Sequence, residues 1–127
     1  MRYLVVAWLC CASCFGSAAP ASAGAGSTAL DEALSQLQAG DATGAAAALR
    51  RITTSEPGNV PAWRALGKAS RQLHDHAQAI SAYQHALQLA PDSPRDFYAL
   101  GSEYAAQHDA GHAFEWLARA AATHRYD

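Results

Sequence analysis

Cysteine is absent from the chain after residue 14, and its three cysteines, Cys10, Cys11 and Cys14, lie close together near the amino terminus. Beyond that segment the sequence therefore offers no disulfide, no zinc–thiolate site and no cysteine nucleophile. Neither sign of charge is in large excess, because the chain has 9 Lys and Arg and 11 Asp and Glu, for a net charge of −2. This balance gives no general attraction to nucleic acid or to anionic lipid. Stability must come from packing, and 127 residues suffice for one ordinary domain.

The first 23 residues have the pattern of a secretory signal peptide. A positive start at Arg2 precedes a mostly apolar stretch, residues 3–15, and Ala21 and Ala23 supply the small residues that signal peptidase reads. The apolar stretch is shorter than the ~20 residues that a membrane-spanning helix needs. We therefore expect cleavage after Ala23, export of a domain over residues 24–127, and no membrane span in the mature form. Removal of Arg2 changes the net charge from −2 to −3.

A second interpretation of the leader makes Cys14 the lipidated first residue of an outer-membrane lipoprotein. Ala12 and Ser13 are as small as such a signal requires. The position three residues before Cys14 holds Cys11, however, where lipoprotein signals usually carry leucine. Cleavage after Ala23 therefore remains the main expectation, and the mass of the mature protein distinguishes the two.

The sequence repeats itself at an interval of 34 residues. Asp41, Asp75 and Asp109 are spaced in this way. Other positions that keep the interval are Ala45, Ala79 and Ala113; Leu49, Tyr83 and Leu117; Pro57 and Pro91; Trp63 and Phe97; Leu66 and Leu100; Gly67 and Gly101; and Ala86 and Ala120. A fixed period of this length is typical of solenoids, in which each repeat packs only against its neighbours.

Each copy divides at its aspartate into two segments with helical spacing of apolar residues. An aspartate at that point can accept hydrogen bonds from the unpaired N–H groups that open the second helix. The sequence therefore predicts six helices in three hairpins and no strand. The expected ranges are residues 28–38, 42–55, 61–73, 76–89, 95–107 and 110–123.

The middle copy resembles a tetratricopeptide repeat. The residues that carry this resemblance are Trp63, Leu66, Gly67, Ala79, Tyr83, Ala86 and Pro91. The last copy is similar through Phe97, Leu100, Gly101, Tyr104, Ala113, Leu117 and Ala120. The resemblance implies an all-α fold, an α-solenoid of three antiparallel helix hairpins with a right-handed superhelical twist. The repeats are expected at about residues 27–59, 60–93 and 94–127.

The first copy departs from the pattern. Strict 34-residue spacing puts Glu32 and Gln36 in apolar slots. The apolar residues that recover the pattern, if the inter-helix turn is one residue shorter, are Leu30, Ala33, Leu34 and Leu37. We therefore expect a shortened turn in the first hairpin.

Two glycines fall inside predicted helices, where glycine costs ~0.5–1 kcal/mol relative to alanine. Close approach of the two helices of a hairpin would compensate this cost at Gly67 and Gly101. Ala79 and Ala113 are the small partners that we expect on the facing helices, with Trp63, Phe97, Tyr83 and Leu117 filling the wider spaces.

The resemblance also implies a concave groove, lined by the first helix of each pair, that takes a peptide or a segment of a partner. The residues expected to line it are Asp31, Ser35, Gln38, Arg64, Lys68, Arg71, Arg95, Tyr98 and Ser102. Arg64, Lys68 and Arg71 share one helix face, which favours an acidic or carboxylate-terminated partner. The family's carboxylate clamp also uses asparagines that these helices lack, so that clamp is not implied. In the alternative interpretation the stripe only solvates a helix face, with Asp31 pairing with Arg64.

A second candidate surface lies on the last helix. Trp116 has Ala48 and Ala82 as its repeat equivalents, and no further hairpin follows it. Phe114 and Trp116 could form an apolar end that pairs with another copy, which would make a homodimer and a self-associating structural protein. Alternatively, Trp116 folds over its own helix end as a substitute cap.

Four histidines, His74, His76, His108 and His112, fall in two equivalent turns and suggest a metal carrier as a third interpretation. Adjacent repeats stack ~10 Å apart, which is too far for equivalent histidines to share one ion, so we expect exposed turn histidines and no metal.

We also find no Gly-rich phosphate loop, no nucleophile with an evident base and no converging carboxylate pair, so no enzyme and no cofactor are expected. The sequence predicts a non-enzymatic protein-interaction module, a scaffold or assembly factor of the periplasm or cell envelope, that binds no nucleic acid.

Overall fold

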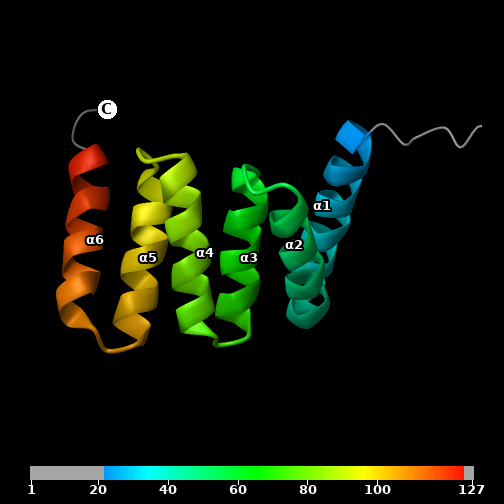
Figure 1. Cartoon of the computed structure of the whole chain (residues 1–127). Helices are drawn as coiled ribbons and strands as arrows, with labels where there is room; N and C mark the ends of the chain where they lie inside the picture. The colour runs from blue at the N-terminus through cyan, green and yellow to red at the C-terminus, as the bar shows by residue number, and fades with distance from the viewer. Residues whose placement is uncertain (1–21, 125–127) are drawn as a thin grey trace, which may run out of the picture.

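The structure, a computed structural model, describes residues 22–124 of the chain and shows six helices in a row (Figure 1). They are α1 (Ser22–Gln38), α2 (Ala42–Ser55), α3 (Val60–Gln72), α4 (His76–Leu89), α5 (Pro94–Ala106) and α6 (Ala110–His124). The described residues contain no strand, and the predicted all-α solenoid of three hairpins is confirmed. Five helices match their predicted ranges to within one residue at either end, whereas α1 begins six residues earlier than expected.

The leader lies almost wholly outside the described residues. The apolar stretch and Cys14 are not described, and the predicted cleavage after Ala23 would remove the first two residues of α1. Within the described part of the chain, no helix combines the length and the apolar character needed to cross a bilayer.

Side-chain caps start the helices as the sequence predicts. Asp41 and Asp75 accept hydrogen bonds from the N–H groups of Gly44, at 2.9 Å, and Gln78, at 3.1 Å. Asp109 accepts one from the N–H of His112 at 3.2 Å. These bonds satisfy N–H groups that have no partner within the helix, which is why an aspartate divides each repeat.

The turn inside each hairpin has the same hydrogen bonds in all three repeats. The amide of the second residue between the helices bonds to a carbonyl three residues earlier, in the pairs Gly40 to Leu37, His74 to Arg71, and His108 to Ala105. The amide of the capping aspartate bonds five residues back, in the pairs Asp41 to Gln36, Asp75 to Ser70, and Asp109 to Tyr104. Every pair is 34 residues from the next, so the expectation of a shortened first turn was wrong.

The second residue between the helices has left-handed backbone geometry in every hairpin, with φ of 90° at Gly40, 58° at His74 and 62° at His108. A side chain is strained there, whereas glycine is not. We therefore expect His74→Gly to raise the free energy of unfolding by about 0.5–1 kcal/mol, after allowance for the greater freedom of glycine in the unfolded chain. Chemical denaturation would measure the change. Gly40→Ala is the opposite substitution and should lower the free energy of unfolding. A loss of stability in His74→Gly would contradict the prediction.

The two helices of a hairpin approach each other most closely at the predicted glycines. A Cβ atom on Gly67 would lie 2.7 Å from Cε2 and Cζ of Tyr83, and one on Gly101 would lie 2.6 Å from Cγ of Leu117. Ala79 and Ala113 are buried as expected. The side chains that leave no room for a Cβ, however, are Tyr83 and Leu117, which were expected only to fill the surrounding space.

The helices form an inner and an outer row. Each helix packs against the next along the chain, and α1 also contacts α3, whereas α2 and α4 make at most a marginal contact. The odd-numbered helices also meet through side chains, because Arg64 and Arg71 of α3 pair with Asp96 and Glu103 of α5. These contacts put α1, α3 and α5 next to one another on one side of the row, called the inner side here, where the groove is expected.

Candidate functional site

Arg64, on the inner side of α3, is held by a buried carboxylate of the next repeat. Its Nε lies 2.9 Å from both carboxylate oxygens of Asp96, and its Nη2 lies 2.8 Å from Oδ2. Nη2 also donates to the hydroxyl of Ser93 at 3.1 Å. The Asp96 side chain is 0% exposed. The charge of Arg64 is therefore compensated from α5, and Asp31, the partner considered in the alternative interpretation, is not the one that binds it.

Arg71 lies near a second buried carboxylate of α5. Oε2 of Glu103 is 2.9 Å from Nδ1 of His76, while Nε of Arg71 is 3.8 Å from Oε1. That Oε1 atom is buried and has no hydrogen-bond partner among the described residues. The Arg71 contact is therefore a charge attraction without a hydrogen bond.

Tyr83 packs beside these charges and stays neutral. Burial raises the pKa of Tyr83 to about 12, the Arg71 guanidinium acts in the opposite direction, and the negative charges of Glu103 and Asp96 add to the rise. Because a phenol that ionises only at about pH 12 carries no charge near neutrality, Tyr83 acts here as a core residue.

The joint between the first two repeats is apolar at the same positions. Where Arg64, Arg71 and His76 stand in the second repeat, the first has residues 34 positions earlier, namely Leu30, Leu37 and Ala42. The residues that replace Asp96 and Glu103 are Ala62 and Ala69, both fully buried. The second and third repeats therefore contact each other through ion pairs at the positions where the first and second repeats contact each other through apolar side chains.

Sequence reasoning missed the two buried acids, although the 34-residue interval contained the signal. Asp96 and Glu103 stand at the repeat positions of Ala62 and Ala69, which belong to the apolar face of α3. Acidic residues on a face that packs against the preceding repeat need a cation opposite. Arg64 and Arg71 were the available cations.

One cation of the predicted stripe is left without compensation. Lys68 is exposed and takes part in no ion pair among the described residues, and the same is true of Arg95 on α5. Ser102 donates its hydroxyl hydrogen to the carbonyl of Ala99 at 2.7 Å within its own helix. The inner face is therefore less basic than the sequence suggested, and the predicted groove cations that have no ion pair among the described residues are Lys68 and Arg95.

The first repeat contributes different residues to this face from those predicted. With the strict turn register, Leu30 and Leu34 occupy the positions of Arg64 and Lys68, and both are half-buried. Asp31 and Ser35 occupy the positions of Ala65 and Ala69, on the side that faces away from the second repeat. Gln38 is exposed at the position of Gln72. The structure thus groups the stripe on α3 with leucines of α1.

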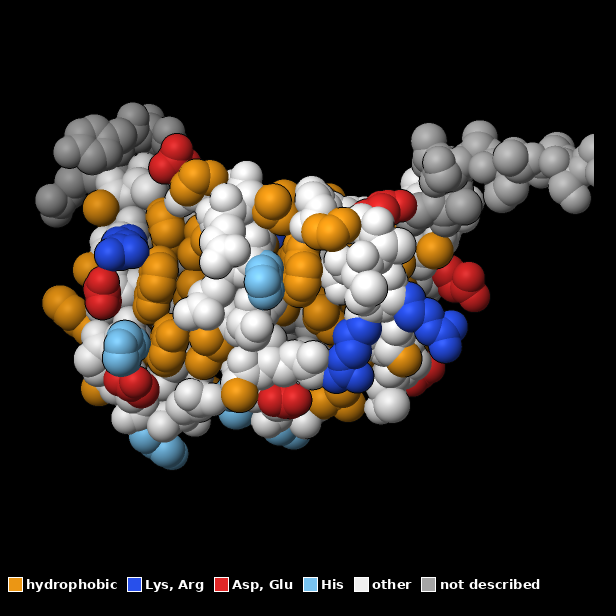
Figure 2. Space-filling model, in the orientation of Figure 1, with side chains coloured by type: hydrophobic (Ala, Val, Ile, Leu, Met, Phe, Trp, Pro, Cys, Tyr) orange, Lys and Arg blue, Asp and Glu red, His pale blue; other side chains and the backbone are white. Residues whose placement is uncertain are grey.

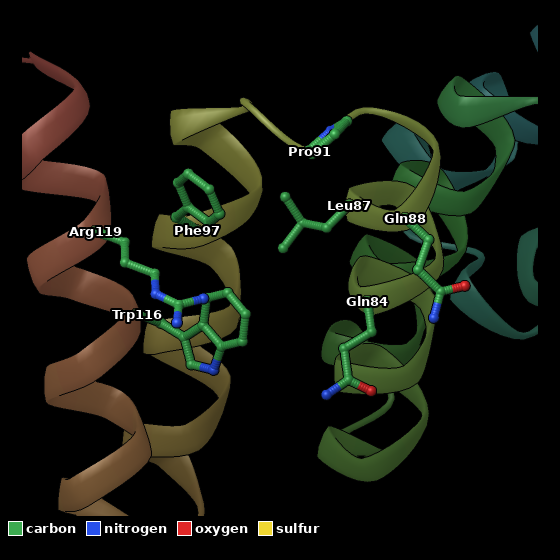
Figure 3. A pocket seen from close by; sticks show the side chains of 7 residues that line it. All are labelled: Gln84, Leu87, Gln88, Pro91, Phe97, Trp116 and Arg119. Carbon is green, nitrogen blue, oxygen red and sulfur yellow. The ribbon is translucent and has the colours of Figure 1, made fainter.

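The predicted end residues lie on two separate surfaces. Phe114 is exposed and lines a cleft at the end of the row. Trp116 instead stacks on Phe97, with ring centroids 5.9 Å apart, and the guanidinium of Arg119 lies 4.6 Å from its ring. A second cleft, between α4 and the last hairpin, is lined by Gln84, Leu87, Gln88, Pro91, Phe97, Trp116 and Arg119 (Figure 3). Hydrophobic side chains are visible along this cleft in Figure 2.

The turn histidines make pairwise contacts. Nδ1 of His112 is 2.7 Å from Oδ2 of Asp109, and the side-chain hydrogen bond from His112, followed by its backbone N–H, lowers the pKa of Asp109. The rings of His74 and His76 meet edge to face with centroids 6.3 Å apart. Across residues 22–124, the structure groups no three histidine, cysteine or acidic side chains in a way that could hold a metal ion.

Three stacked hairpins with one turn geometry and one period define an α-solenoid repeat protein. A family model described as tetratricopeptide repeat matches residues 30–94, which is half of the chain. The chain therefore belongs to the tetratricopeptide repeat family.

Solved structures share this fold at low sequence identity. The structure of PcrH in complex with the chaperone binding region of PopB has a TM-score of 0.79 and 17% identity, over 84% of this chain and 86% of that one. Two structures of MamA, one of them MamA MSR-1 C2, have a TM-score of 0.76 and identities of 21% and 18%. They match 80% of this chain, which spans only 58% and 59% of their length. No curated protein sequence gives a significant match.

Proposed function

We propose that the protein is a non-enzymatic interaction module that holds a segment of another protein against its inner face. The observation that carries the proposal is the arrangement around Lys68, an uncompensated cation between Arg64, which the buried Asp96 holds by hydrogen bonds, and Arg71, which the buried Glu103 attracts at 3.8 Å. On one side of it lie Leu30 and Leu34, and on the other lies the exposed ring of Tyr98. This surface suits a segment that has an acidic side chain or terminal carboxylate and apolar residues around it.

The fold comparison supports a protein partner. PcrH, whose fold this chain shares, was solved with the chaperone binding region of PopB bound. A row of helical hairpins offers an extended surface that such a segment can follow. By analogy of fold, the segment held by this chain is proposed to lie across α1, α3 and α5.

We further propose that the module works outside the cytoplasm, in the periplasm or cell envelope, as a scaffold or assembly factor. The support is the signal-peptide pattern of residues 1–23. Lipidation at Cys14 would place it on the outer membrane instead. The mass of the mature protein separates the two outcomes, because only cleavage after Ala23 yields a chain that begins at Gly24.

The groove is tested by substitution of Lys68 and not of Arg64. Replacement of Arg64 would leave the buried Asp96 without a partner, so a loss of stability would also weaken binding. A partner purified from the native envelope fraction and identified by mass spectrometry would be titrated against the wild type and against Lys68→Glu. We expect Lys68→Glu to raise the Kd at least about tenfold, or 1.4 kcal/mol, because an acidic segment would meet a like charge.

The matched control is Arg51→Glu, which makes the same charge change at an exposed position on α2, in the outer row. It should leave the Kd within about twofold of the wild type if distance from the groove removes the effect. Equal weakening by both substitutions would show a response to net charge alone, and no weakening by Lys68→Glu would place the partner elsewhere.

A further inference from the structure

Three repeat positions that are buried on α2 and α4 are exposed on α6. The positions of Phe114, Leu117 and Ala121 are held on α4 by Ile80, Tyr83 and Leu87, which are 8%, 3% and 8% exposed. On α2 they are held by Ala46, Leu49 and Thr53, which are also buried. The next hairpin covers these residues in both cases. On α6 no described residue covers them, so Phe114 is 76% and Leu117 37% exposed.

This open face has a projecting side chain and a recess on opposite sides of Leu117. Phe114 projects beside a cleft that is lined by Ala105, His108, Ala110, Ala113 and Leu117. Another cleft, distinct from the one between α4 and the last hairpin, lies further along α6. It is lined by Pro94, Arg95, Tyr98, Leu117, Ala120 and Ala121. Phe114 and Ala121 are seven residues apart, which is two helical turns or ~10.5 Å. Leu117 borders both clefts and lies near the midpoint.

The other end of the row does not match this apolar face. The positions through which α3 and α5 pack on a preceding repeat are held on α1 by Asp31, Glu32 and Ser35, all exposed. Head-to-tail stacking of two copies would bury both carboxylates against the apolar side chains of Phe114 and Leu117, at a large cost in desolvation. The amino-terminal end thus has the polar character of a capping repeat.

We propose that two copies of the chain pair through α6 about a two-fold axis near Leu117. The two α6 helices run antiparallel, and Phe114 of each copy enters the cleft between Tyr98 and Ala121 of the other. A two-fold contact needs one self-complementary patch, and a projection and a recess equidistant from the axis provide it. The same axis brings the end of α5 that carries Arg95 to the end of the second copy where Asp109 opens α6, which adds opposite charges at the rim.

The area of the patch sets the strength of this dimer. With 150–250 Å² for a whole aromatic side chain, the exposed parts of Phe114 and Tyr98 amount to roughly 250 Å². Leu117 and the neighbouring alanines bring each copy to roughly 400–500 Å², so a pair would bury about 800–1,000 Å², at the low end for specific interfaces. We therefore expect a Kd on the order of tens of micromolar and a dimer that forms only at high concentration.

Sedimentation equilibrium of the full chain over a range of concentrations tests the association. The wild type is expected to follow a monomer–dimer equilibrium. Phe114→Ala, which removes the projecting ring, and Ala121→Phe, which fills the recess, should each raise the Kd at least tenfold. Both residues lie on the exposed face, and thermal unfolding checks that the variants remain folded. A wild type that stays monomeric at millimolar concentration would overturn the proposal.

The register is tested by exchanging the projection and the recess. The double variant Phe114→Ala with Ala121→Phe places the ring at position 121 and the space at position 114, so the two-fold geometry recovers at least part of the lost affinity. A double variant that associates no better than either single variant would refute the antiparallel register. Gln88→Ala, on the exposed side of α4, is the matched control and should leave the Kd unchanged.

The dimer and the groove share Tyr98, but their variants separate them, because Phe114 lies on α6 and Lys68 on α3. Lys68→Glu lies on α3, away from the proposed dimer contact, and should not alter the sedimentation behaviour. Phe114→Ala should not alter the Kd of a groove partner beyond twofold. Loss of self-association in Lys68→Glu would instead show that copies pair through the inner face, which contradicts the α6 interface.

Discussion

Replacing Arg64 by leucine is expected to lower the free energy of unfolding by about 3 kcal/mol. The substitution removes the only cation that the described residues place within bonding distance of Asp96, whose side chain is 0% exposed, and also the donor to Ser93. A buried carboxylate without its partner keeps the whole cost of leaving water. Urea denaturation monitored by circular dichroism would measure the loss.

The chain itself supplies the compensating change. Arg64→Leu combined with Asp96→Ala copies the pair Leu30 and Ala62 of the joint between the first two repeats. Because an apolar pair of suitable shape can replace a buried ion pair at little cost, the double variant should return to within about 1 kcal/mol of the wild type. Equal destabilisation of the single and double variants would show that the ion pair is not what holds this joint.

Gly67→Ala is expected to destabilise the protein by about 2 kcal/mol, even after the gain of about 1 kcal/mol that alanine brings to a helix interior. The new Cβ would lie 2.7 Å from two ring atoms of Tyr83 and 2.9 Å from a third. The ring is buried, so α3 and α4 would have to separate. Differential scanning calorimetry would show the effect as a lower Tm.

Two further variants isolate the steric cause. Gly111→Ala adds the same methyl group near the start of α6, where the nearest atom is 3.7 Å away, and should be neutral or stabilising. Gly67→Ala combined with Tyr83→Leu copies Ala33 and Leu49 of the first hairpin, so the double variant should lose less stability than the two single variants summed. Strict additivity would contradict a direct contact between the two positions.

The sequence predicts the helices of this protein well because its local signals agree with its period. Asp41, Asp75 and Asp109 mark the turns by capping the helices that follow, and helical spacing marks the rest. The exception is α1, which starts earlier than predicted because Ala and Gly residues before Thr28 carry no apolar periodicity to mark a boundary. The shortened first turn was inferred from Glu32 and Gln36 in apolar slots. Glu32 is exposed because no described residue covers that side of α1, whereas Gln36 is only half-buried and its Oε1 atom has no hydrogen-bond partner among the described residues.

The site was less predictable because its charges are set by residues far apart in the chain. Arg64, Lys68 and Arg71 were correctly placed on one helix face, but helical spacing says nothing about what lies opposite. Asp96 is 32 residues from Arg64 and belongs to another hairpin. Only the stacking of the third repeat on the second brings them together and leaves Lys68 as the cation of the stripe that has no ion pair among the described residues. Trp116 shows the same limit, since its contact with Phe97 depends on how α6 rotates against α5.

The two unlike joints fix the order of the hairpins. If the third hairpin docked on the first, Asp96 and Glu103 would face Leu30 and Leu37 and would lie buried without a cation. If the second hairpin lost its neighbour to a competing copy, Arg64 and Arg71 would have no carboxylate to meet. Repeats of nearly identical backbone are prone to mispairing and exchange during folding. In this protein a wrong neighbour would leave buried charges unpaired. The charges, as well as the shapes of the contact surfaces, therefore disfavour a wrong order of hairpins.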